Sequence, residues 1–179
     1  MMRRREIEAR LFLYDELSGI LGAMKSFALV ELRRITRREE AERHAMDTLK
    51  TALNDMVSAL PPAPETTGDI WLLFGSTRGF CGSFNEDVLR AWNENRGAKS
   101  PTVAIGERFS LLLPEQPGVE WIPGAAGAQD APDVIIHLLA AVDRLRNQHL
   151  GKAGLIACLR EEHGVQMHRL LPLPVPDFK

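Results

Sequence analysis

The chain has 179 residues, of which 45% are apolar and 26% are charged, proportions typical of a folded protein rather than a disordered one. This length accommodates one compact domain with an appendage. The formal net charge of −2 excludes nucleic-acid binding through overall electrostatic attraction.

Residues 1–60 are predicted to form a single long helix. No proline interrupts Arg3 to Leu60, and apolar residues recur at intervals of three and four, at Ile7, Leu11, Tyr14, Leu17, Leu21, Met24, Ala28, Leu32 and Ile35. This stripe is typical of a helix that packs along its length against another helix, as in a coiled coil. At 1.5 Å per residue the helix would run on the order of 80 Å, so much of it must project from a domain of this size.

A proline-rich linker, 61–68, is predicted to end the helix and to lead into an α/β domain over 69–171. The predicted strands of this domain are Ile70–Phe74, Thr102–Ile105, Glu120–Ile122, Leu155–Cys158 and Gln166–Leu171, the last a half-buried edge strand because its residues alternate. The predicted helices are Asn85–Glu94, Glu107–Leu113 and Pro132–Leu150. Alternation of short apolar runs with helical stretches indicates a doubly wound, mostly parallel sheet. The tail, 172–179, is proline-rich and cannot continue a central strand.

A glycine-rich turn, Gly75–Asn85, joins the first predicted strand to the helix after it, where open α/β sheets gather ligands. It lacks the Lys-Ser/Thr ending of a P-loop and the spacing of a dinucleotide fingerprint. Its glycines at 75, 79 and 82 are better explained by tight turns with positive φ. Cys81 would need a neighbouring histidine to act as a nucleophile, and no motif supplies one, so we expect it to be buried under the turn.

No metal site, cofactor or nucleic-acid partner is expected. The two cysteines and five histidines show no metal-ligand spacing, and the cysteines require no oxidising compartment. The basic cluster Arg33–Arg38 lacks interleaved aromatic residues and is followed by glutamates, which favours a solvated or partner-facing helix surface. The N-terminus has no apolar signal-peptide core, and no run approaches the roughly 20 apolar residues that span a bilayer. We expect a cytoplasmic protein that reaches a membrane only through its partners.

Two stretches carry a family resemblance. The γ subunit of F-type rotary ATP synthases has a signature segment between a strand and a helix, Ser-Asp-Arg-Gly-Leu-Cys-Gly-Gly-Phe-Asn. The chain keeps it at Ser76, Arg78, Gly79, Cys81, Gly82, Phe84 and Asn85, and departs from it at Thr77, Phe80 and Ser83. In that family the N-terminal helix carries a segment resembling Ala-Met-Lys-Met-Val-Ala-Ala-Ser-Lys-Leu-Arg-Arg, which the chain matches at Met24-Lys25, Ala28 and Leu32-Arg33-Arg34.

The resemblance implies a Rossmann-like domain and a rotor subunit without catalytic residues. Met24, Lys25, Arg33 and Arg34 would contact the ring of α and β subunits, where cations meet a carboxylate-bearing loop of the β subunit. Glu31 stands where the family often has lysine, which weakens the local positive field. Arg78, Gly79, Cys81, Gly82 and Asn85 would form a structural turn, or a contact of the domain's foot with rotor neighbours, namely the ε subunit and the c-ring. Arg78 is the expected polar contact.

The Gly-Phe-Cys-Gly variant and the opening Met2-Arg3-Arg4-Arg5-Glu6 resemble the γ subunit of the N-type ATPases, a branch associated with ion pumping. The family has a second long C-terminal helix that winds on the first, and it is absent here, through trimming or because the natural product is short; we expect trimming. Without it, the exposed helix should pair with another copy, fray or aggregate. The two remaining alternatives are a coiled-coil adaptor that kept only the γ fold and a Rossmann-like nucleotide-binding module or enzyme.

Overall fold

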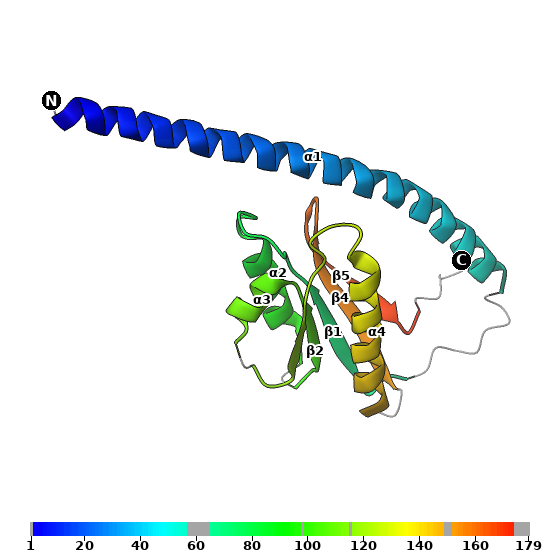
Figure 1. The fold of residues 1–179 in the computed structure, drawn as a ribbon. Coiled ribbons are helices and arrows are strands. Elements are labelled where there is room, and N and C mark those ends of the chain that lie inside the picture. Colours follow the sequence, from blue (N-terminus) through cyan, green and yellow to red (C-terminus); the bar gives the residue numbers. More distant parts are fainter. Residues whose placement is uncertain (1, 57–64, 98, 115, 149–151, 174–179) are drawn as a thin grey trace. The chain divides into compact units, whose positions relative to one another are not determined.

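The computed structural model describes residues 2–56, 65–97, 99–114, 116–148 and 152–173 (Figure 1). The chain divides into two compact units, residues 1–52 and 53–179, each of which is described by itself. Most of the predicted linker and tail, 61–64 and 174–179, lies outside the described residues, as do the last residues predicted for the first helix and for the helix ending at Leu150.

The first unit consists of one uninterrupted helix, α1 (Met2–Met56), which ends just beyond the unit boundary. Ion pairs one turn apart support its surface, as between Arg10 and Glu6 (2.8 Å) and between Arg43 and Glu39 (2.6 Å). All the large apolar residues of the predicted stripe are exposed by 46–65%. Further exposed apolar side chains lie outside that stripe, at Phe12, Leu13, Ile20, Phe27 and Val30.

The second unit is built on a five-stranded sheet in the order β3-β2-β1-β4-β5. Its strands are β1 (Gly68–Phe74), β2 (Thr102–Ile105), β3 (Val119–Ile122), β4 (Ala153–Glu161) and β5 (Gly164–Leu171). The first four run parallel and β5 is antiparallel to β4. The predicted strands and the mostly parallel α/β arrangement are thereby confirmed.

Helices cover both faces of the sheet (Figure 1). On one face, α2 (Phe84–Asn95) and α3 (Glu107–Leu112) bury Trp92 and Phe109 against Trp71 and Leu73 of β1. On the other face, α4 (Ala131–Gln148) packs Ala141 and Val142 onto the sheet. The strands β1 and β2 are buried on both faces, as their continuous apolar sequences require in a parallel sheet.

The prediction that Gln166–Leu171 is half-buried with alternating exposure is wrong. Residues 166–170 are all exposed. The helices cover the central strands and reach β5 only near its ends, where Val165 packs on one face of the core and Leu171 on the other. Alternation in the sequence therefore did not translate into alternating burial at this edge.

Candidate functional site

The segment from Gly75, which follows β1, to Phe84, the first residue of α2, is called the 75–84 loop, and it is closed by the side chain of Asn85 in the first turn of α2. Asn85 is 2% exposed. Its Oδ1 accepts a hydrogen bond from the backbone N–H of Ser76 (2.9 Å), and its Nδ2 donates to Ser76 Oγ (2.9 Å) and to Cys81 Sγ (3.3 Å). A buried amide that makes these bonds stabilises one loop conformation, because leaving its groups unpaired would be expensive.

Cys81 lies inside this network. Its Sγ is 3.1 Å from Ser76 Oγ, and it donates a long bond to the carbonyl oxygen of Arg78 (3.8 Å). The thiol lies under the turn as predicted, but it is partly exposed rather than buried. Its polar contacts are with loop groups, so the geometry indicates a structural thiol and not a cysteine–histidine pair.

Arg78 ties the loop to the segment after β3. Its guanidinium donates to the carbonyl oxygen of Ala126 (3.0 Å), 48 residues away in sequence. The backbone continues this closure, since Gly75 N–H donates to Ile105 O (2.8 Å) and Arg108 N–H to Ser76 O (3.2 Å). Arg78 therefore makes an intramolecular contact that braces the loop, a role that its position in the sequence did not indicate.

The glycines of the loop serve packing more than backbone freedom. Of Gly75, Gly79 and Gly82, only Gly82 has a positive φ (59°), which corrects the prediction for the other two. A Cβ at Gly75 would lie 2.5 Å from the ring of Phe109, so the residue is small because α3 packs directly on the end of β1. The carboxyl end of β1 is thus closed by an aromatic ring, an arrangement unlike a phosphate cradle.

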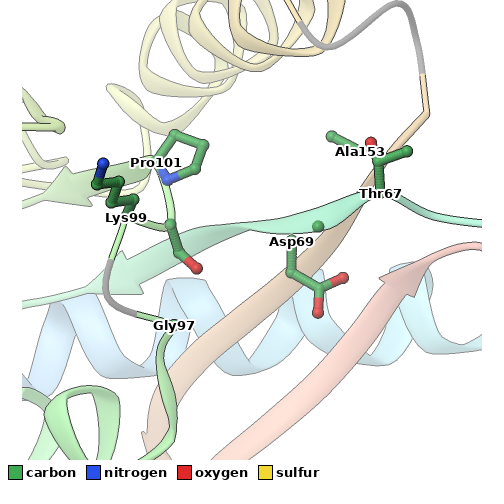
Figure 2. Close-up of a pocket in the computed structure, with 8 residues that line it drawn as sticks. Thr67, Asp69, Gly97, Lys99, Pro101 and Ala153 are labelled. Carbon is green, nitrogen blue, oxygen red and sulfur yellow. The ribbon is translucent and has the colours of Figure 1, made fainter.

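A cavity of about 240 Å³ lies at the opposite end of the sheet (Figure 2). It is lined by residues near the amino ends of β1, β2 and β4, including Thr67, Asp69, Gly97, Lys99, Pro101 and Ala153. Asp69 accepts two bonds from Arg169 (2.8 and 3.1 Å), which raise the pKa of that guanidinium. Open α/β sheets bind ligands at the carboxyl ends of their strands, so this cavity does not lie where a nucleotide site is expected.

The four residues predicted to contact a ring of subunits lie on α1. Met24 is 53% exposed, and Lys25, Arg33 and Arg34 are also exposed. Arg34 lies 3.7 Å from Glu31 in an ion pair. Successive helical residues point about 100° apart, so Lys25 and Arg33 lie about 80° apart around the helix, and Met24 and Arg34 lie about 80° apart on its other side. The structure therefore spreads the four around the helix.

Two features escaped the sequence analysis. Phe80 is fully exposed in the 75–84 loop, with a φ of 61°. On α1, Phe12, Ile20 and Phe27 recur at intervals of seven and eight, so they form a second apolar line beside the predicted stripe. The second line was detectable from the same helical period, whereas the backbone conformation of Phe80 had no signal beyond its glycine neighbours.

Within the described residues, no helix has the length and apolar character needed to cross a membrane. Likewise, no three His, Cys, Asp or Glu side chains of the described part of the chain are grouped to hold a metal ion.

The chain is similar to known proteins. A family model described as ATP synthase matches residues 3–152. The ATP synthase gamma chain of Mycoplasma mycoides subsp. mycoides SC is 23% identical over 115 residues, which is 60% of this chain and 41% of the relative. The mitochondrial ATP synthase rotor of Euglena gracilis in rotational state 1 matches 86% of this chain and 56% of its own, with a TM-score of 0.47 and 15% identity. The chain thus spans about half the length of the proteins it matches.

Proposed function

Since the chain belongs to the γ-subunit family of ATP synthases, we propose that it forms part of the central stalk, the rotor shaft of a rotary ATPase. In this role the chain itself catalyses no covalent step. Each rotational position of an asymmetric shaft would favour one conformation of a surrounding catalytic site through differential contacts. Rotation would thereby couple ATP synthesis or hydrolysis to ion translocation through a membrane sector.

The observation that carries this proposal is the surface of α1. The helix has 55 residues and would extend about 80 Å at 1.5 Å per residue. Its large apolar side chains are exposed along two lines, the Ile7–Ile35 stripe and the line of Phe12, Ile20 and Phe27. A helix that is apolar on more than one side is stable in water only when it is enclosed on more than one side. A shaft that winds on a second helix inside a ring of subunits meets that requirement.

We assign the Ile7–Ile35 stripe to a second long helix that winds on α1, and the other sides of this same segment to the α and β subunits. Lys25 and Arg33 lie about 80° apart around the helix, so long side chains from both could reach one carboxylate-bearing loop of the β subunit. Arg34 would meet another part of the ring, and Met24, a member of the stripe, would contact the ring where the second helix borders it. The ion pair of Arg34 with Glu31 weakens the positive field locally.

The α/β domain would be the foot of the shaft, binding the ε subunit and the c-ring. The 75–84 loop supports this role because it is braced at Asn85 and Arg78 and exposed at its tip. The complex would hold the protein at the membrane surface. The Gly79-Phe80-Cys81-Gly82 sequence and the opening Met2-Arg3-Arg4-Arg5-Glu6 support the N-type branch of the family, with H⁺ or Na⁺ as the coupling ion.

Assembly with the α and β subunits of the same source tests the proposal. The chain, extended by the segment that follows it in its gene where one exists, should yield a complex that hydrolyses ATP. Replacing Lys25 and Arg33 together by Ala should lower hydrolysis severalfold without preventing assembly. Lys50→Ala on the same helix is the matched control, since Lys50 is exposed and lies outside the proposed contact. If neither the chain as given nor its extended form associates with α and β, the rotor proposal is overturned, and an adaptor that keeps only the γ fold is favoured.

A further inference from the structure

One ion pair of the α/β domain reaches across three strands of the sheet. Arg169 of β5 donates two hydrogen bonds to the carboxylate of Asp69 of β1 (2.8 and 3.1 Å), although β4 lies between these two strands. The pair crosses β4 at Gly154, the register partner of Asp69. A Cβ at Gly154 would lie 2.2 Å from Asp69 Oδ1 and 2.9 Å from Arg169 Nη1, so a side chain at this position would block the crossing.

The pair joins the two points at which the chain enters and leaves the sheet. Asp69 is the second residue of β1, the strand that follows the linker from α1, and Arg169 lies two residues before the end of β5. A backbone bond from Thr67 N–H to Lys152 O (3.1 Å) also holds the entry point. On the exit side, Arg169 donates a longer bond to the carbonyl oxygen of Leu171 (3.4 Å), so it contacts the last residue of β5 as well.

The exit point has fewer strand contacts than the entry point. The central strand β1 pairs with β2 and β4, whereas β5 is an edge strand that pairs with β4 alone. The pairing of β5 is irregular between Leu155 and Ile156 of β4, opposite the end that carries Arg169. Strand ends with few neighbours open locally before the whole domain unfolds. The ion pair bonds this end of the edge strand directly to a central strand.

We propose that Asp69 and Arg169 form a clasp that keeps the entry and the exit of the chain together when the rotor is under torsional load. The inference rests on the proposed function and adds a load-bearing contact to it. Along the chain, a force on α1 reaches the sheet at the amino end of β1, and a force on the segment after β5 reaches it at Leu171. With the clasp closed, the two points move together. With the clasp open, the end of β5 can separate from β4 while β1 stays in place.

The clasp should add little to the stability of a domain that bears no load. Both side chains are partly exposed, by 26% for Asp69 and 44% for Arg169, and solvent screens ion pairs of this kind. Removing the pair should therefore lower the melting temperature by less than about 5 °C. The effect should be found instead in the local opening of β5.

Hydrogen exchange of the full chain tests the contact itself. In Asp69→Ala and in Arg169→Met, amides of Gly164–Leu171 should exchange about two- to fivefold faster, whereas amides of Thr102–Ile105 in β2 should exchange as in the wild type. The double variant should exchange no faster than either single variant, because the two side chains act through one contact. Unchanged exchange in β5, or equal acceleration in β2, would overturn the clasp.

Arg144→Met is the matched control. It removes another partly exposed ion pair, between Arg144 of α4 and Glu120 of β3, at the opposite edge of the sheet. Exchange of β5 should remain as in the wild type. Faster exchange of β5 in this control would show that the loss of any surface ion pair loosens the strand, and the clasp would be refuted.

The assembled complex tests the load-bearing role. With Cys81 replaced by Ser, a probe is attached through Glu94→Cys on the exposed surface of α2, and rotation is arrested with a non-hydrolysable nucleotide. The mean-square angular fluctuation of the probe should increase about twofold in Arg169→Met and stay unchanged in Arg144→Met. If the complex assembles and depends on Lys25 and Arg33 while Arg169→Met fluctuates as the wild type does, only this inference fails. If no complex assembles, the proposed function fails and the load-bearing role with it.

Discussion

Asn85 and Ser76 are joined by two hydrogen bonds, from Ser76 N–H to Asn85 Oδ1 and from Asn85 Nδ2 to Ser76 Oγ, both 2.9 Å. The two residues lie at opposite ends of the loop that follows β1, so this pair closes the loop where the strand gives way to α2. The two bonds hold a glycine-rich segment in one conformation, so the same contacts stabilise the domain and fix the shape of the loop.

Replacing Asn85 by Ala should lower the free energy of unfolding of the α/β domain by about 1–3 kcal/mol, because the part-buried Ser76 N–H would lose its acceptor. Denaturant unfolding of the wild type and the variant measures the difference. Asn95→Ala is the matched control. Asn95 is exposed and donates only to the carbonyl oxygen of Ala91, so its loss should change stability by less than about 0.5 kcal/mol. Equal effects of the two substitutions would contradict the role given to Asn85.

Gly75 and Gly79 should respond differently to the same substitution. A methyl group at Gly75 would lie 2.5 Å from the ring of Phe109, and Gly75→Ala should destabilise the domain by about 1–3 kcal/mol through overpacking. At Gly79 nothing lies within 4 Å of an added Cβ, so Gly79→Ala should be neutral within about 0.5 kcal/mol or slightly stabilising. Thermal unfolding of the two variants side by side measures this. The idea of a packing glycine fails if Gly75→Ala is tolerated as well as Gly79→Ala.

Asp87 should contribute stability that depends on pH. A hydrogen bond from Ser83 and the charge of Arg160 lower the pKa of this carboxyl below its ordinary value of 3.8. The pKa of Asp87 is lower in the folded state than in the unfolded state. Its contribution to the free energy of unfolding is therefore fully present above the unfolded-state pKa, and it is lost as the pH falls through the folded-state pKa. Asp87→Asn should therefore be less stable than the wild type at pH 7, and the gap should narrow below about pH 4. Denaturant unfolding at pH 7 and pH 3 measures the gap, with Glu86→Gln as the exposed neighbouring control. A gap that is constant with pH would refute the assignment.

The two thiols should differ in reactivity. Burial raises the pKa of the Cys158 thiol to about 11, so roughly one molecule in a thousand would carry the thiolate at pH 8. Cys81 is partly exposed. A colorimetric disulfide reagent should thus titrate one thiol rapidly in the native protein and two after denaturation. Cys81→Ser should abolish the rapid phase; its persistence would show that Cys158 is accessible.

The sequence alone determined the type and order of the elements. The helical spacing from Ile7 to Ile35 and the absence of proline predicted α1, and apolar runs such as Ile70–Phe74 predicted the buried parallel strands. These signals are local and repeat along the chain, so they are visible without knowledge of distant residues. The motif at Ser76–Asn85 likewise predicted a turn between a strand and a helix, because its position between the two is a local property.

Only the tertiary structure decided what each residue of that loop does. Gly75 is small because Phe109, 34 positions later, packs on it, and Arg78 is held by Ala126, 48 positions later. The exposure of β5 depends on how far the covering helices reach across the sheet. Each of these depends on contacts between residues far apart in the chain, and a single sequence does not record which distant residues meet.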